Sequence, residues 1–288
     1  MNHLFCFGLG FSGRALGHSL FQDGWKVSGT TRSPEKLKVL EQKGFGVYFF
    51  PGEECLIEVQ LVSATHIIVT IPPKEEGDVV FREFREAIIQ AKNLKWLGYI
   101  SSTGVYGNHN NKWVDETSFL TPSNERNLLR VKVENQWLEL GRKKSIGIHI
   151  FRSAGIYGPG RNMLETVKSG KARRIEKKGQ VNGRIHVEDL VSVLKASIGK
   201  PNPGSIYNVC DDEPAPSKEV VEFACQLLKI NPPPVISFNK AELSEMARIF
   251  YLDNKKIKNK KIKIELNIKL KYPNYREGLK AIFCLGNL

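Results

Sequence analysis

A glycine-rich turn between a strand and a helix constrains the fold of this chain most strongly. The stretch Gly8-Leu9-Gly10-Phe11-Ser12-Gly13 follows an apolar strand (3–7) and precedes a helical pattern (15–21). In this context the first glycine permits a tight turn, the second lets a pyrophosphate approach the backbone, and the third lets strand and helix pack closely. The positive end of the helix then faces the phosphates. We expect a dinucleotide site built from Gly8, Gly10, Phe11, Ser12 and Gly13, and the alternative is an ordinary strand–helix turn.

The end of the second expected strand indicates which dinucleotide the site prefers. Sites that prefer NAD place an Asp or Glu there, on the ribose 2′-hydroxyl. This strand ends in Thr31-Arg32-Ser33, without an acid. A guanidinium flanked by hydroxyls suits a 2′-phosphate, so we expect NADP(H) in preference to NAD(H). The alternative is that Arg32 is a solvated loop cation.

The length and composition limit the class of protein. With 288 residues, 41% of them hydrophobic, the chain can form one large α/β domain and a smaller one. No apolar run is long enough for a transmembrane helix, and the first strand begins where a signal peptide would lie, so we expect a cytoplasmic protein. The five cysteines are odd in number and widely spaced, and we expect neither a disulfide framework nor a zinc or other metal site.

The net charge of +13 leaves three interpretations open. Basic residues concentrate between Lys168 and Arg184 and again between Lys255 and Lys271. They can form solvated faces, attract an anionic substrate to a positive cleft, or bind nucleic acid. Nucleic acid is the least favoured partner, because no nucleic-acid motif is present and the aromatic residues are not interleaved with the basic runs.

Strands and helices alternate through the first half of the chain. Short apolar runs at 45–50, 66–71, 96–101 and 146–152 are typical of strands buried on both faces, and residues 79–93 and 124–140 have helical spacing. This alternation predicts a doubly wound, Rossmann-type parallel sheet with its chemistry in the loops at the carboxyl ends of the strands. We expect residues 1–158 and 184–209 to form the cofactor domain. Residues 159–183, with a basic helix and loop at 161–182, and residues 210–288 would form a small substrate-binding lobe.

Several motifs, in order, resemble the extended short-chain dehydrogenase/reductase superfamily. They are Ser101-Ser102-Thr103-Gly104-Val105-Tyr106-Gly107, Arg152 with Gly155-Ile156-Tyr157-Gly158-Pro159-Gly160, Arg184-Ile185-His186-Val187-Glu188-Asp189-Leu190, and Tyr207-Asn208-Val209. The resemblance covers nearly the whole chain and implies the group of NAD(P)-dependent nucleotide-sugar epimerases and dehydratases. It also implies further cofactor contacts from the loops after the strands, which would be Ile71, Pro72, Ser101 and Gly155.

The chain departs from that family at two motifs. Extended members usually show G-x-x-G-x-x-G, whose first glycine would be Phe7 here. The family's Y-x-x-x-K precedes a glutamate, and Glu134 sets the register, so that Arg126 stands at the tyrosine position and Arg130 at the lysine position. The chain therefore resembles an atypical member of the YeeZ-like kind, which lacks the catalytic tyrosine.

Arginine cannot replace that tyrosine as a proton shuttle, because it stays protonated at any working pH. Arg126 and Arg130 lie four residues apart on one helix face, and they can hold an anion or simply cover the helix surface. Ser102 stands at the family's catalytic Ser/Thr position beside Thr103, where its hydroxyl can bind a substrate oxygen or cap the strand. Tyr106 and Tyr157 are alternative proton donors.

Residues of the expected substrate side are Arg161, Arg184 and His186, although a buried structural histidine is the favoured interpretation of His186. Two functions remain open. The first is an NADP(H)-dependent oxidoreductase or epimerase acting on an anionic or sugar-like small molecule through a non-standard active site. The second is an NADP(H)-binding sensor or scaffold without turnover. The family habit implies a homodimer.

Overall fold

The computed structural model describes residues 1–286, without the side chains of residues 245, 246, 249 and 250. The chain divides into two compact units. The first unit comprises residues 1–102, 128–152 and 191–207, and the second comprises residues 103–127, 153–190 and 208–288. This division differs from the expected domains mainly in residues 103–127, which pack in the second unit.

A seven-stranded sheet forms the centre of the fold, in the order β11-β7-β5-β4-β1-β2-β3. Its strands are β1 (His3–Phe7), β2 (Lys26–Thr31), β3 (Gly46–Phe49), β4 (His66–Val69), β5 (Trp96–Ser102), β7 (Ile148–Ser153) and β11 (Ile206–Val209). Strand β1 pairs in parallel with both β2 and β4, so the order reverses beside β1. Ligands of such sheets bind outside the carboxyl ends at this switch point. The expected Rossmann-type fold is confirmed.

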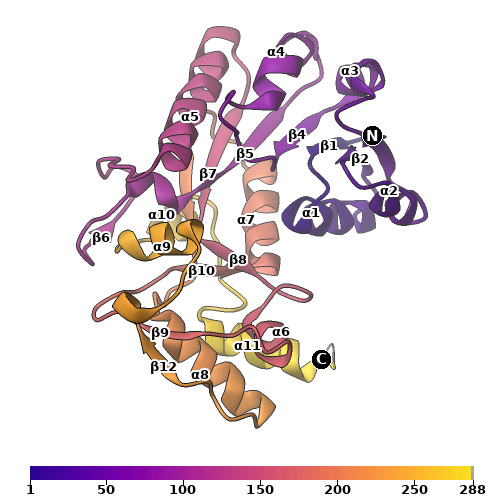
Figure 1. Ribbon diagram of the computed structural model, residues 1–288. Coiled ribbons are helices and arrows are strands. Elements are labelled where there is room, and N and C mark those ends of the chain that lie inside the picture. Colours follow the sequence, from indigo (N-terminus) through magenta and orange to yellow (C-terminus); the bar gives the residue numbers. More distant parts are fainter. Residues whose placement is uncertain (287–288) are drawn as a thin grey trace. The chain divides into compact units, whose positions relative to one another are not determined.

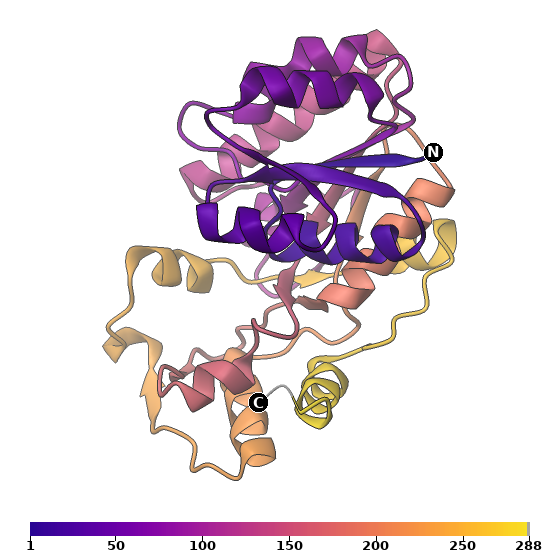
Figure 2. The ribbon, with the colours of Figure 1, turned by 90° about the vertical axis from the view of Figure 1, so that its right-hand side faces the viewer.

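Helices cover both faces of this sheet (Figures 1 and 2). One face carries α1 (Phe11–Gln22) and α7 (Val187–Gly199), and the other carries α3 (Glu54–Ser63), α4 (Val79–Gln90) and α5 (Glu125–Lys144). Helix α2 (Pro34–Glu41) packs beside β3. Between the sheet and α3–α5 lies an apolar core that includes Phe5, Phe84, Tyr99 and Trp137, all completely buried.

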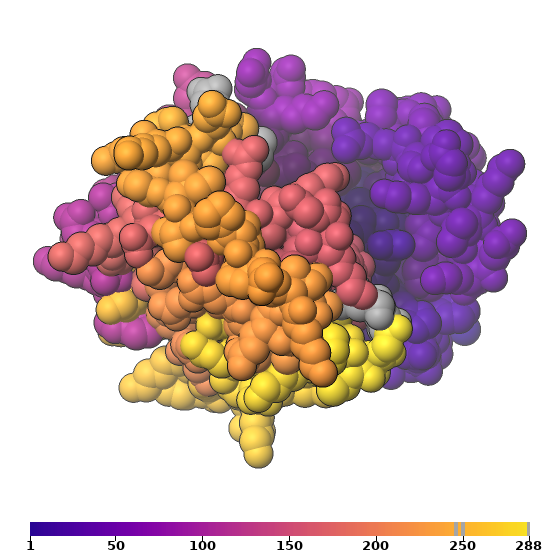
Figure 3. All heavy atoms as spheres, turned by 60° about the horizontal axis from the view of Figure 1, so that its bottom comes forward, coloured from indigo at the N-terminus to yellow at the C-terminus, as the bar shows by residue number. Residues whose placement is uncertain are grey.

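The second unit has its own core and three parallel strand pairs. These pairs join β8 (Gly155–Tyr157) to β10 (Arg184–His186), β9 (Arg174–Glu176) to β12 (Val235–Ser237), and β6 (Trp113–Val114) to β13 (Lys256–Ile257). Helices α6 (Met163–Lys168), α8 (Ser217–Leu228) and α11 (Tyr275–Cys284) share the core. The remaining elements are η1 (Thr103–Tyr106), η2 (Phe238–Lys240), α9 (Glu245–Leu252) and α10 (Lys260–Glu265). Figure 3 shows residues of this unit as pink, orange and yellow spheres.

The second unit departs most from the sequence-based expectations. The segment at 161–182, expected to form a basic helix and loop, contains the short helix at 163–168, but strand β9 was not expected within its loop. Basic residues are frequent in this segment, and its buried apolar side chains are the separate residues Leu164, Val167 and Ile175. In the second basic run Ile257 and Ile262 are buried, whereas Ile264 is 66% exposed. Among residues 1–286, no helix is long and apolar enough to cross a membrane.

Candidate functional site

The turn after β1 is held by threonines from two neighbouring strands. Gly8 donates its N–H to Thr30 Oγ1 at 2.9 Å, and Thr70 Oγ1 donates to the carbonyl oxygen of Gly8 at 2.7 Å. Gly8 has a φ of +96°, a conformation that favours glycine. The sequence predictions did not include Thr30 and Thr70. Their signal is a threonine at the carboxyl end of each strand beside the glycine turn.

Gly10 and Gly13 serve different purposes. A methyl group on Gly13 would lie 2.3 Å from the Gly8 carbonyl oxygen, so this glycine is needed for packing. A methyl group on Gly10 would meet no atom within 4 Å. Gly10 is the N-cap of α1 and brings no side chain, and the first turn of that helix has no acidic residue. The turn therefore leaves an open space at the N-terminus of α1, where partial positive charge gathers.

The tip of β2 carries a basic residue beside a hydroxyl group that already forms hydrogen bonds within the chain. Arg32 is exposed and makes no ion pair within the described part of the chain. The Ser33 hydroxyl accepts from the N–H of Lys36 at 3.3 Å and donates to the Glu35 carboxylate at 2.5 Å, because Ser33 is the N-cap of α2. Thr31 is buried. Of the three predicted residues at this tip, Arg32 alone has an exposed, uncommitted polar group.

The other predicted cofactor residues lie at or near the ends of further strands. Ile71, which is half-buried, and Pro72, which is exposed, follow β4. Gly155 begins β8 in the second unit and is exposed. Phe11 and Ser12 open α1 and are half-buried. The Ser101 hydroxyl is buried and donates to Glu134 Oε1 at 2.5 Å. Ser101 therefore contributes to the internal structure of the first unit.

Glu134 organises a buried charge network behind the end of β5. Arg152 holds its carboxylate with two nitrogens, and the Nη2–Oε2 distance is 2.8 Å. Both side chains are almost completely buried, so each charge depends on the other. On the same helix, Trp137 donates its indole N–H to Asp78 at 2.9 Å. This network fixes α5 against the strand that ends in Ser102.

The two arginines of α5 have different environments despite their spacing. Arg130 is 9% exposed and donates to the carbonyl oxygen of Ile100 at 3.3 Å. Arg126 lies one turn earlier, near the N-terminus of the helix, and is exposed. The structure thus buries the arginine at the family's lysine position in the first unit and leaves the one at the tyrosine position in solvent.

The remaining catalytic candidates flank the end of β5. Ser102 is its last residue and Thr103 is the first residue of η1, and both are half-buried. Tyr106 is completely buried, and its hydroxyl donates to Asn208 Oδ1 at 2.7 Å. Tyr157 is also buried, and burial beside Asp211 raises its pKa. Neither tyrosine is therefore placed as a ready proton donor.

The predicted substrate residues lie in the second unit. Arg184 donates to the carbonyl oxygens of Asn182 and Ala215 at 2.9 and 3.1 Å. His186 is 1% exposed between Tyr157 and Tyr272, and burial lowers its pKa to about 4, so it is neutral at pH 7. Arg161 is exposed beyond β8. The side chains of Arg184 and His186 are thus part of the internal structure of the second unit.

Asp211 is the most perturbed carboxyl group of this unit. It is 2% exposed, and neither carboxylate oxygen has a hydrogen-bond partner among the described residues. Burial raises the pKa of Asp211 to about 8, and the nearby Arg184 guanidinium opposes that rise only in part. The carboxyl group is therefore mostly protonated at neutral pH.

A cavity of about 620 Å³ lies within the second unit, at a place that sequence reasoning missed. Its lining includes Lys177, Lys178, Lys218, Lys256, Ser217 and Tyr251. Lys218 pairs with Glu176, and Lys177 donates to the carbonyl oxygen of Tyr251. Lys178 and Lys256 form no ion pair with the residues described, so they give the cavity a net positive charge.

Two residues of the cavity lining carry buried amide oxygens. Gln180 Oε1 and Asn111 Oδ1 have no hydrogen-bond partner within the described residues, and both residues line the cavity. Gln180 Nε2 donates to the carbonyl oxygen of Asp253 at 2.6 Å, which fixes the orientation of its amide. Buried polar atoms are normally paired. The cavity is thus lined by cations and by polar side chains, while no cluster of metal-binding side chains occurs within residues 1–286.

Comparison with known proteins places the chain in a family. No family model matches it. A solved structure of a functionally unknown conserved protein from Silicibacter pomeroyi is 42% identical, covers 99% of both chains and has a TM-score of 0.92. The chain belongs to the family of this protein. The YeeZ protein of Escherichia coli (strain K12) is 26% identical over 277 residues, which are 93% of this chain and 95% of YeeZ.

More distant structures share the fold. The dTDP-glucose 4,6-dehydratase of Bacillus anthracis, solved in complex with NAD, is 19% identical with a TM-score of 0.78 and covers 99% of this chain and 96% of its own. The UDP-glucose 4-epimerase of Thermotoga maritima, solved with UDP-glucose, is 17% identical with a TM-score of 0.76. The match covers 98% of this chain and 97% of the epimerase chain. The expected resemblance to the YeeZ-like kind is confirmed, and the more distant structures show the fold of a dehydratase and of an epimerase.

Proposed function

We propose that this protein binds NADP(H) and acts as an oxidoreductase or epimerase on an anionic, nucleotide-sugar-like substrate. The observation that carries the proposal is the open space at Gly10, beside a helix N-terminus without side-chain cap or acidic residue. A pyrophosphate fits that space and finds backbone N–H groups there. Gly8, Gly10 and the start of α1 would hold the dinucleotide, which supplies hydride transfer when bound.

The preference for NADP(H) rests on two exposed arginines of the first unit. Arg32 follows β2, and Arg14 lies in the first turn of α1, where its Nε donates to the Gly10 carbonyl oxygen at 3.3 Å. Guanidinium groups bind phosphates through a bidentate fork. The ribose 2′-phosphate of NADP would meet Arg32. Glu35 lies nearby in sequence, but its carboxylate is bonded to Ser33.

The substrate would bind in the cavity of the second unit. Lys178 and Lys256 suit a phosphate, and the polar lining residues Asn111, Gln180 and Ser217 suit the hydrogen-bonding groups of a base or a sugar. The epimerase of Thermotoga maritima was solved with UDP-glucose, which carries both kinds of group. This chemistry favours a nucleoside diphosphate sugar over a simple carboxylate.

One observation favours the second candidate function, an NADP(H)-binding sensor or scaffold without turnover. Arg130, at the family's lysine position, bonds to the backbone of β5, so it cannot assist a proton donor at the cofactor. Ser102 is then the remaining side chain at the family's catalytic positions with a transferable proton.

Ser102→Ala separates the two functions. The purified protein would be incubated with NADPH or NADP⁺ and a panel of nucleotide sugars, ketones and aldehydes. If the protein is an enzyme, turnover is expected for at least one compound and should fall by about 10²-fold or more in Ser102→Ala, since proton transfer contributes that much. Binding of NADPH should not change in the variant. Absence of turnover in the wild-type protein across the whole panel would support the sensor.

A further inference from the structure

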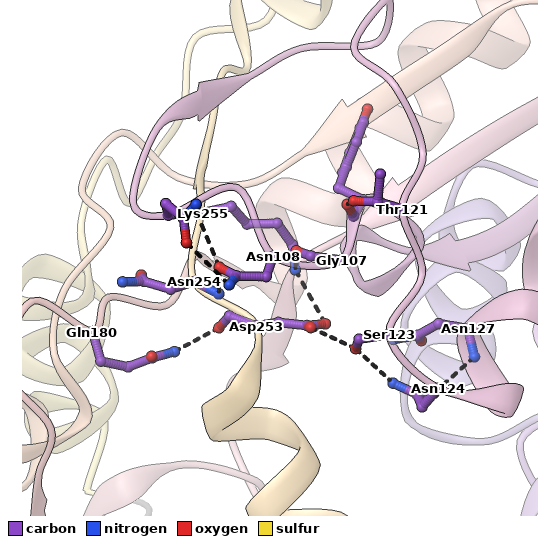
Figure 4. A network of polar contacts seen from close by, with 12 residues as sticks. Gly107, Asn108, Thr121, Ser123, Asn124, Asn127, Gln180, Asp253, Asn254 and Lys255 are labelled. Carbon is purple, nitrogen blue, oxygen red and sulfur yellow. Dashed lines mark hydrogen bonds and ion pairs between the residues drawn. The ribbon is translucent and has the colours of Figure 1, made fainter.

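Residues 253–255, here called the strap, run between two segments of the second unit (Figure 4) that contribute Asn111 and residues 179–181 to the cavity lining. One segment is the turn at 107–111, where Asn110 and Asn111 have positive φ angles of 49° and 63°. The other is the loop at 179–181. The strap itself leads from Tyr251 to Lys256, which also line the cavity. The turn and the loop, two walls of one cavity, therefore meet along the strap.

The backbone of Asn254 binds the first of these walls. Its N–H donates to Asn108 Oδ1 at 3.2 Å. Its carbonyl oxygen accepts from the N–H groups of His109 and Asn111 at 3.1 and 3.0 Å. These three bonds hold the turn that carries Asn111, a residue of the cavity lining.

The side chain of Asn254 binds the second wall with both ends of its amide. Oδ1 accepts from the N–H of Val181 at 3.2 Å, and Nδ2 donates to the carbonyl oxygen of Gly179 at 2.9 Å. Gln180, between these two residues, donates to the Asp253 carbonyl oxygen. One asparagine thus sets the distance between both walls.

The flanking strap residues extend this connection toward η1 and α5. Lys255 Nζ donates to the carbonyl oxygen of Gly107 at 2.8 Å, and Asp253 Oδ1 accepts from the Ser123 hydroxyl at 2.6 Å (Figure 4). The two strap side chains also pair at 3.5 Å, and both are about 10% exposed or less. The segment from Gly107 to Ser123 joins η1, which begins with Thr103, to α5.

We propose that Asn254 is a positioning residue: it aligns the two cavity walls, so that a ligand in the cavity also orders the turn at 107–111. The proposal rests on the assignment of the cavity as the substrate site. A ligand that contacts residues 177–181 would order them. This ordering would pass through the side-chain amide of Asn254 to its backbone, and from there to the turn at 107–111. No direct contact between the ligand and the turn beyond Asn111 is required.

The test compares Asn254→Ala with Asn259→Ala in the full-length protein. Asn259 is a matched control, because its Nδ2 also donates to backbone oxygens of the same unit, those of Cys210 and Asp211, but it does not line the cavity. The probe is UDP. Calorimetry gives its affinity, and hydrogen exchange with mass spectrometry gives backbone protection with and without UDP.

We expect Asn254→Ala to weaken UDP binding about tenfold, the effect of losing two hydrogen bonds that order a binding wall. Without UDP, exchange should speed up at 179–182. With UDP at saturation, protection should reach 107–111 in the wild-type protein and in Asn259→Ala but not in Asn254→Ala. Equal UDP affinities in all three proteins, or equal losses in both variants, would overturn the proposal.

The same experiment separates this proposal from the proposed function. If the wild-type protein binds no UDP, the assignment of the cavity to nucleotide-sugar substrates fails. Exchange without ligand still tests the role of Asn254 in that case. Faster exchange at 179–182 in Asn254→Ala, but not in Asn259→Ala, would retain its positioning role, and unchanged exchange would refute it.

Discussion

Gly10→Ala is expected to lower the affinity for NADPH by at least about 100-fold, or about 2.7 kcal/mol of binding free energy, and to leave the fold intact. The added methyl group meets no protein atom within 4 Å and the backbone has a negative φ of −78°, so nothing in the chain opposes it. It occupies the space that a pyrophosphate needs. Titration with NADPH and a thermal unfolding curve would be measured on the same preparation.

Gly13→Ala is the matched control three residues away. Its methyl group would lie 2.3 Å from the Gly8 carbonyl oxygen and 2.6 Å from Cys6 Sγ, so the turn must shift. We expect it to destabilise the fold by about 1–3 kcal/mol or more, as overpacking does. If Gly10→Ala binds NADPH like the wild-type protein, the open space is not the pyrophosphate site.

Asp211→Asn is expected to be more stable than the wild-type protein by an amount that grows as the pH rises. The folded chain holds the Asp211 proton up to a pKa of about 8, whereas the unfolded chain releases it near 3.8. The folded state therefore binds more protons between these values, and the stability contribution of this group is lost as the pH rises through about 8. At about 1.4 kcal/mol per pKa unit, wild-type stability should fall by up to about 4 kcal/mol relative to Asp211→Asn between about pH 5 and about pH 9.

Asp189→Asn is expected to have the opposite effect on stability. Its buried carboxylate accepts from the N–H groups of Lys271 and Tyr272 at 2.7 and 2.9 Å. An amide cannot accept with both ends, so we expect this variant to be less stable than the wild-type protein at every pH. Urea unfolding at several pH values measures both variants. A difference between wild type and Asp211→Asn that does not change with pH would show that Asp211 is already ionised.

The sequence was sufficient to predict the first unit because its signals are local. The glycine turn, the apolar strands and the helical spacing each lie within a few consecutive residues, and the sheet order follows from the connections between them. Helix boundaries moved by a few residues, and α5 extends to Lys144. Thr30 and Thr70 were missed because their role depends on the pairing of β2 and β4 with β1.

The second unit was less predictable because its features combine distant segments. The cavity is lined by residues from Asn111 to Lys256, and no local pattern indicates that these segments meet. Spacing alone also could not distinguish the environments of the two arginines. Residues four apart share a helix face, but Arg130 lies against β5, whereas Arg126 lies a turn closer to the exposed helix end.

The most direct test of the account is a fluorescence titration of the purified protein with NADPH and with NADH, repeated with Arg32→Asp. We expect NADPH to bind at least about tenfold more tightly than NADH, since one phosphate–guanidinium interaction is worth about 1.5–3 kcal/mol. Arg32→Asp should remove this preference and retain weak binding of NADH. Equal affinities of the wild-type protein for both cofactors would contradict the assignment of Arg32, and no binding of either would contradict the proposed function.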